Sequence, residues 1–429
     1  MGDIGRRVAI TGVGLLTGLG IGAQDTWEGL LAGASAVRPL ERYDPSSLST
    51  QLGAEVRDLR PRDFVENRRS LRTMTDHDLF NTVAAVLAVR DSGLELGDDP
   101  EGRVALFVGG NKETNDPDKW EEIALAVRRP DGTVDMKRFG EQASSSVAPL
   151  FYLEGLQAAS LFYISEAFGA RGANTYFSGT AEAGLTSIGR GFRAIKRAEA
   201  DVAIAGGADA PLGWWNMAKL DALGAFTHRN DLGAGACRPY DRDRDGTVPG
   251  EGAAYLVLED LDSARARDAE VYAEVTGFGS ATDSGRLITP DPDGSALARA
   301  TEAALGEARV PIEEIGYVAA EGSGTRAGDV SEARALRGLL GAANGVVVSS
   351  VKPAVGHLVA GAGAANAAVA ALALRRGALP GTLNLEHVDP ACAGLDYNPG
   401  AAREAQVTGA LAVARGWEGQ NVVLALRAV

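Results

Sequence analysis

The stretch Val8-Ala-Ile-Thr-Gly-Val-Gly14 returns later in the chain as Ala273-Glu-Val-Thr-Gly-Phe-Gly279, and this repetition decides the fold that we expect. Each stretch is a short apolar run that leads into a Thr-Gly-x-Gly turn, which is typical of a buried strand. Four ordered repeats of this kind indicate an internal duplication. The other three pairs are Val104–Gly110 with Ile315–Glu321, Thr175–Glu182 with Val346–Lys352, and Gly252–Glu259 with Asn421–Arg427.

The duplication predicts an α/β protein built as a duplicated, layered αβαβα sandwich. We expect an N-terminal half over residues 1–265 and a C-terminal half over residues 266–429. Short apolar runs such as Val202–Ala205 favour strands that are covered on both faces. Residues 284–294 indicate a long surface loop. The apolar run Phe151–Ile164 predicts one helix, buried either in the core or in a subunit interface.

Composition and charge exclude several classes of function. The net charge of −15 over 429 residues disfavours nucleic acid and anionic membranes as partners. The chain has neither a long apolar run nor a signal-peptide core, so we expect a cytoplasmic protein without a membrane association. One basic cluster stands out against this acidic background, and it is either a docking surface for an acidic partner or a solvated face. The cluster comprises Arg60, Arg62, Arg68, Arg69 and Arg72.

Motifs for cofactors and metals are incomplete. Gly12-Val-Gly14 follows an expected strand but lacks the third glycine of a dinucleotide-binding loop. Asp241–Gly246 looks like the start of an EF-hand loop, yet Gly252 stands where that loop needs a glutamate. The histidines show no metal-ligand spacing, and Cys237 and Cys392 are too few for a disulfide framework. We therefore expect no cofactor and no metal.

Three segments resemble the active-site motifs of the β-ketoacyl synthase family. They are Ser178–Gly184 (Ser-Gly-Thr-Ala-Glu-Ala-Gly), Glu321–Thr325 (Glu-Gly-Ser-Gly-Thr) and Ser350–Leu358 (Ser-Val-Lys-Pro-Ala-Val-Gly-His-Leu). Condensing members of this family have Thr-Ala-Cys-Ala, His-Gly-Thr-Gly-Thr and a Lys followed by Gly-His at these places. The resemblance covers residues 6–427 and implies the duplicated thiolase-like sandwich of that family.

The departures from these motifs are as informative as the matches. Glu182 stands where the family has its nucleophilic cysteine, and Glu321 stands where it has its first histidine. Lys352 and His357 are retained. We hypothesise that these four side chains converge in one buried place, where two carboxylates and two cations neutralise one another. The alternative is that Glu182 points into a solvated pocket and has no role.

The loop that helps to gate the pocket in the family is also altered. The family's Gly-Phe-Gly-Gly reads Gly416-Trp417-Glu418-Gly419 here. A glutamate at the elbow cannot replace the thiolate, because its acylation would give a labile anhydride instead of a thioester. Condensation by this chain alone is therefore not expected.

The resemblance then implies a KSβ, or chain-length-factor, subunit of a type II polyketide synthase. Such a subunit is inactive alone, forms a heterodimer with an active ketosynthase (KSα) and shapes the cavity for the polyketide chain on an acyl carrier protein. One alternative is a decarboxylase that makes a starter unit from a malonyl thioester, and another is a homodimeric scaffold. Decarboxylation is disfavoured because the first histidine is absent and Glu182 would repel the malonyl carboxylate.

The resemblance also points to candidate residues of the interface and the cavity. We expect the partner subunit to pair near residues 150–180, and residues 111–120 to help close the end of the cavity. Aromatic side chains in these segments suit an interface, whereas ordinary core packing is the alternative. The candidates are Trp120, Phe151, Tyr152, Tyr176 and Phe177.

Overall fold

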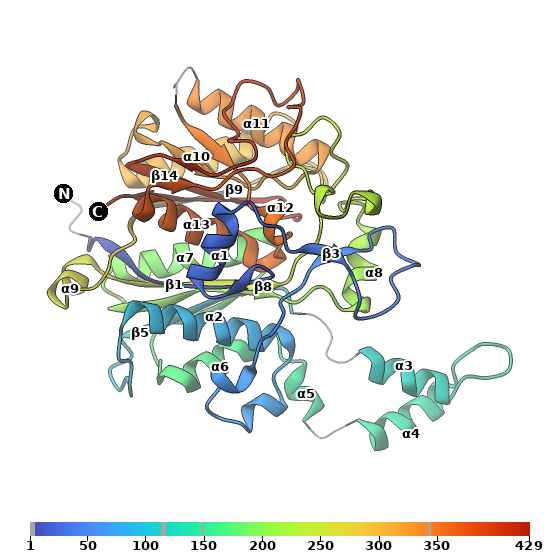
Figure 1. Cartoon of the computed structure of the whole chain (residues 1–429). Helices are drawn as coiled ribbons and strands as arrows, with labels where there is room; N and C mark the ends of the chain where they lie inside the picture. The colour runs from blue at the N-terminus through green and yellow to red at the C-terminus, as the bar shows by residue number, and fades with distance from the viewer. Residues whose placement is uncertain (1–4, 113–116, 148–149, 342–344) are drawn as a thin grey trace.

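A mixed β-sheet runs through the molecule in the computed structural model, which describes residues 5–112, 117–147, 150–341 and 345–429 (Figure 1). Eleven of the described strands belong to this sheet. Their order is β11 (Val347–Ser349), β10 (Tyr317–Ala319), β14 (Gly409–Arg415), β15 (Gln420–Arg427), β9 (Ala273–Thr282), β1 (Val8–Thr17), β8 (Gly252–Asp260), β7 (Val202–Asp209), β5 (Val104–Gly110) and β6 (Asn174–Ser178), while β2 (Gly20–Ile21) pairs with β1.

The strand order contains the duplication that the sequence predicts. From β1 outward, β8 and β7 pair antiparallel and β5 and β6 pair parallel. From β9 outward, β15 and β14 pair antiparallel and β10 and β11 pair parallel. The four repeated sequences thus occupy equivalent strands, and the predicted α/β sandwich is confirmed. The two parts join where β1 and β9 pair through Val8, Ala9 and Ile10.

The helices lie in layers on and between the two parts of the sheet (Figure 1). The inner helices, α7 (Ala181–Lys196) and α13 (Ala362–Arg376), contact strands of both parts. The helix α2 (Asp76–Ser92) packs against the N-terminal part, and α6 (Ala159–Phe168) lies beside α2. The helices α10 (Ser295–Ala308) and α11 (Arg326–Leu340) lie outside the C-terminal part. These layers form the sandwich. The division of the chain into halves over residues 1–265 and 266–429 stays a proposal.

Other short elements surround these layers. The helices α3 (Pro117–Ala126) and α4 (Met136–Ser146) form an arm that projects from the body (Figure 1). None of the described helices combines the length and hydropathy that crossing a bilayer requires. The remaining elements are α1 (Ala23–Leu31), β3 (Val37–Pro39), β4 (Leu52–Ala54), α5 (Phe151–Glu154), α8 (Trp214–Ala222), α9 (Leu261–Ala266), α12 (Lys352–Val355), β12 (Ala378–Leu379), β13 (Arg403–Glu404) and five short 3-10 turns, at Pro61–Asp63, Ser70–Arg72, Asn230–Gly235, Ile312–Glu314 and Val359–Gly361.

The prediction of one buried helix over Phe151–Ile164 is wrong. The helix α5 ends before Gly155, a poor helix former, and α6 begins only at Ala159. Tyr152 is 77% exposed and Phe162 is 60% exposed. These apolar side chains are uncovered because no other described element of this chain packs over them. The expected loop at 284–294 contains no helix or strand, as predicted.

Candidate functional site

The turn between β6 and α7 places Glu182 in the interior of the molecule. β6 ends at Ser178 and α7 begins at Ala181, so Glu182 is the second residue of the helix. Glu182 is 5% exposed. The first turn of a helix has backbone N–H groups without partners in the helix, and these groups favour an acceptor or a negative charge.

Two glycines make room for the Glu182 carboxyl. A Cβ atom added at Gly179 would lie 2.0 Å from Oε1 of Glu182, and one added at Gly416 would lie 2.1 Å from Oε2. Any larger residue at either glycine would displace the carboxyl. Glu182 is therefore packed between the elbow turn and the gate loop, and its carboxyl does not extend freely into solvent.

Burial and a second carboxylate control the charge of Glu182. Burial raises the pKa of Glu182 to about 7, and the negative charge of Glu418 adds to this shift. The Thr180 hydroxyl lies 3.3 Å from Oε2 of Glu182. No described cation forms an ion pair with this carboxyl. The hypothesis that Glu182 is neutralised by the retained lysine and histidine is therefore wrong.

Glu321 and Lys352, by contrast, form a buried ion pair. Lys352 Nζ lies 3.0 Å from Oε1 of Glu321 and also donates a hydrogen bond to the Glu321 carbonyl. Glu321 follows β10, and Lys352 begins α12 after β11, the strand that pairs with β10. Burial alone would raise the pKa of Glu321, but the Lys352 ammonium and the contact with His357 together lower it to about 2.

His357 completes this group as a neutral imidazole. Its Nδ1 accepts a hydrogen bond of 3.0 Å from the backbone N–H of Val359, which assigns the ring proton to Nε2. Nε2 lies 3.3 Å from Oε1 of Glu321. Burial lowers the pKa of His357 and outweighs the opposing effect of Glu321. The group therefore contains one cation, Lys352, instead of the two that the sequence led us to expect.

The gate loop, Gly416–Gly419, is the turn between β14 and β15. The Thr180 hydroxyl accepts a hydrogen bond of 2.9 Å from the Trp417 N–H and donates one of 2.7 Å to Oε2 of Glu418. The Trp417 ring lies 5.1 Å from the His357 ring and is inclined to it by 32°. The loop is thus attached to the elbow turn and covers His357.

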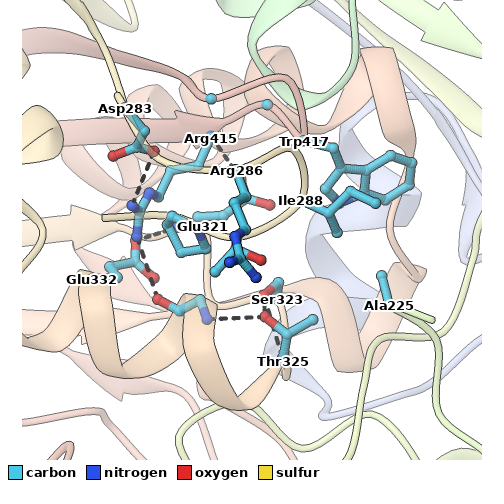
Figure 2. A pocket seen from close by; sticks show the side chains of 15 residues that line it. Ala225, Asp283, Arg286, Ile288, Glu321, Ser323, Thr325, Glu332, Arg415 and Trp417 are labelled. Atoms are coloured by element: carbon cyan, nitrogen blue, oxygen red, sulfur yellow. Dashed lines mark hydrogen bonds and ion pairs between the residues drawn. The ribbon is translucent and has the colours of Figure 1, made fainter. Parts of the chain in front are cut away.

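Cavities lie on both sides of the gate loop. Figure 2 shows the smaller cavity, of about 50 Å³, with Trp417 and Ile288 on one side and Arg415 and Asp283 on the other. Arg415 Nη2 lies 3.6 Å from Oδ2 of Asp283, which places this pair in the wall of the cavity. The larger cavity, of about 330 Å³, is lined by Phe177, Ser178, Glu182, Phe278, Gln420 and Val422, among others.

The two cysteines of the chain lie away from the elbow turn. Cys237 and Cys392 are both fully buried. Burial raises the pKa of each thiol to about 12. Because the thiolate is the reactive form, neither side chain is poised to accept an acyl group. In the described parts of the chain, no group of three His, Cys, Asp or Glu side chains could hold a metal ion.

The five aromatic candidates lie on three elements. Trp120 on α3 meets Phe151 on α5 with ring centroids 5.4 Å apart. Tyr152 points outward from α5, whereas Tyr176 and Phe177 lie on β6 and are partly buried. Phe177 also lines the larger cavity. A role in a cavity or an interface stays a prediction for all five, and residues 113–116 of the expected cavity end lie outside the described residues.

Sequence reasoning missed a buried polar group next to β5. Lys112 Nζ lies 2.6 Å from Oδ2 of Asp78, and both side chains are buried. The Ser160 hydroxyl donates a hydrogen bond of 2.9 Å to the same carboxylate. Beside this pair, the Tyr176 hydroxyl lies 3.2 Å from Nε2 of His77. The signal available in the sequence was a lysine two residues after the apolar strand that ends at Gly110.

Comparisons with known proteins identify the family. The models for the β-ketoacyl synthase N-terminal and C-terminal domains match residues 5–264 and 272–386. A 3-oxoacyl-[acyl-carrier-protein] synthase 2 of Synechocystis sp. is 33% identical over 98% of each chain. A putative polyketide beta-ketoacyl synthase 1 of Streptomyces cyaneus is 36% identical over 98% of this chain and 97% of its own. The solved ishigamide ketosynthase/chain length factor superposes with a TM-score of 0.85 at 31% identity, over 99% of this chain and 100% of that chain. The chain therefore belongs to the β-ketoacyl synthase family.

Proposed function

We propose that the chain is a non-condensing subunit of a type II polyketide ketosynthase, of the kind called KSβ or chain-length factor. It pairs with an active ketosynthase and shapes the cavity in which the chain on an acyl carrier protein grows. The observation that carries this proposal is the Glu182 carboxyl, which fills the elbow between Gly179 and Gly416. A carboxyl there cannot hold an acyl group as the thioester that condensation in this family requires.

The surface beside β6 supports a partner subunit. β6 is the last strand of the sheet and pairs only with β5 among the described strands, so its outer edge offers backbone groups to another chain. Close to this edge, Phe162 and Asn174 line the same shallow cavity. Tyr152 and Leu153 on α5 are also exposed. An apolar surface next to a free strand edge is the kind that a partner protein covers.

The basic cluster supports the docking of an acidic carrier protein. Its five arginines begin with Arg60, directly before the turn Pro61–Asp63, and end with Arg72, the last residue of the turn Ser70–Arg72. All five are exposed. On a chain with a net charge of −15, such a cluster is a local positive region in a negative surface. It would attract an acidic partner at long range and orient its approach.

The geometry of the site argues against the decarboxylase alternative. Decarboxylation of a malonyl thioester needs hydrogen-bond donors aimed at the thioester carbonyl. The Nε2 atom of His357 faces Glu321, and the Lys352 ammonium is paired with the same carboxylate. Trp417 in addition covers the His357 ring. Both potential donors are thus occupied inside the protein.

Coexpression with a ketosynthase that contains the elbow cysteine tests the proposal. We expect the tagged chain to copurify with that ketosynthase in equimolar amounts, and the complex to form a polyketide from malonyl carrier protein. The control is the same complex with the partner's cysteine replaced by alanine, which should assemble and form no product. Covalent loading of a labelled acyl group onto the isolated chain would refute a non-condensing role. Acetyl carrier protein formed by the isolated chain would instead identify a decarboxylase, and self-pairing without any ketosynthase would identify a scaffold.

A further inference from the structure

The gate loop lies between the two cavities. Gly416, Trp417 and Gly419 line the smaller cavity, whereas Gln420, the next residue, lines the larger cavity together with Glu182. The Trp417 ring packs against the ring of the buried His357, so the loop covers that side chain.

A single hydroxyl group attaches the loop to the elbow turn. Thr180 Oγ1 accepts a hydrogen bond of 2.9 Å from the Trp417 N–H. It donates its one proton in a hydrogen bond of 2.7 Å to Glu418 Oε2. Oε2 of Glu182 lies 3.3 Å from the same hydroxyl oxygen and receives no proton from it in this arrangement. Two carboxyl groups therefore meet at one donor, and they repel each other unless one of them is protonated.

The Glu182 carboxyl contacts both the elbow turn and the loop. A Cβ atom added at Gly179 of the elbow would lie 2.0 Å from its Oε1, and one added at Gly416 of the loop would lie 2.1 Å from its Oε2. The same carboxyl also lines the larger cavity. A charge on Glu182 therefore arises in contact with the loop.

The surrounding charges give Glu182 no counter-ion. The nearby cation Lys352 is paired with Glu321, and Arg415 lies beside Asp283 at the base of the loop. The first two turns of α7 carry no other charged side chain, and β6 carries none. The charged and titratable groups around the loop and the elbow are Glu418, Glu321, Lys352, His357, Arg415, Asp283, Arg286 and Glu332.

We propose that Glu182, Thr180 and Glu418 form a proton-operated latch that keeps the gate loop closed while Glu182 is protonated and releases it when Glu182 ionises. This inference does not depend on the proposed partner-subunit role. In the closed loop, burial raises the pKa of Glu182 from 4.5 to about 7, whereas an opened, solvated carboxyl returns toward its ordinary value. Closing thus binds a proton, so opening increases as the pH rises from about 5 to 7 and levels off above that range.

Amide hydrogen exchange of the full-length chain tests the latch. Peptides that span the gate loop, including the Trp417 amide, are followed from pH 5 to pH 8 and corrected for the intrinsic exchange rate. We expect the opening equilibrium of the loop to increase by at least about tenfold across this range. Glu182→Gln should keep the loop protected at every pH, because an amide cannot ionise. Thr180→Val should leave it unprotected at every pH.

Two carboxylate variants and one internal reference complete the experiment. Glu418→Gln, at an exposed position, should reduce the response to pH because the charge that adds to the shift is removed. Glu302→Gln, on the exposed face of α10, is the matched control and should respond as the unmodified chain does. Equal protection at pH 5 and pH 8, or an unchanged response in Glu182→Gln, would overturn the latch. A parallel response of the buried α13 peptide would also overturn it, because the change would then be global unfolding.

Discussion

At the scale of single residues, Glu182 makes the stability of the protein depend on pH. Its pKa is raised from 4.5 in a solvated chain to about 7 in the fold, so the folded state binds the proton more tightly. The stability that the proton contributes is present below about pH 4.5 and is lost as the pH rises to 7. The free energy of unfolding of Glu182→Gln, relative to that of the unmodified chain, should therefore be up to about 3 kcal/mol higher at pH 8 than at pH 5. Urea unfolding of both proteins at the two pH values measures this difference. The same dependence of stability on pH in both proteins would contradict the role of Glu182.

Lys352 is the second residue whose charge the fold depends on. Its ammonium is buried and pairs with Glu321 at 3.0 Å. Lys352→Met should lower the free energy of unfolding by about 3 kcal/mol or more at pH 7, because a buried carboxylate is left without its cation. The double variant Lys352→Met with Glu321→Gln removes both charges and should recover a large part of the loss. Denaturant unfolding of the three chains provides the measurement, and an unchanged melting curve for Lys352→Met would contradict the role of the pair.

At the scale of elements, β6, α5 and α6 form the surface on which we expect the partner to dock. Phe162→Ser and Tyr152→Ser should each weaken the complex by about tenfold, because both rings are exposed in this chain and would be buried by a partner. Leu287→Ser is the matched control, since Leu287 is 73% exposed in the loop at 284–294. Titration of the purified chain with its ketosynthase gives the dissociation constants. Equal effects of all three variants would argue against an interface at β6.

The elements also show where sequence patterns succeed and fail. The repeated apolar runs predicted equivalent strands correctly, because strand formation depends on local patterns that are read directly from the chain. The run Phe151–Ile164 predicts one continuous helix because its apolar residues lie on all sides, but the structure divides it into α5 and α6. The exposed rings of Tyr152 and Phe162 are candidates for contact with a second chain. A local sequence pattern cannot distinguish such side chains from those that form a core.

At the scale of the whole molecule, the sequence is sufficient to predict the duplicated sheet and to place a glutamate at the elbow turn. Both follow from the order and identity of residues along the chain. The charge states of the site depend on the packing of remote segments. Burial raises the pKa of Glu182 to about 7, and the charge of Glu418, far along the chain, adds to this shift. His357 is neutral because it is buried, and Lys352 is committed to Glu321 because β10 and β11 bring them together. Burial and distance set these energies, and both arise only when remote segments pack.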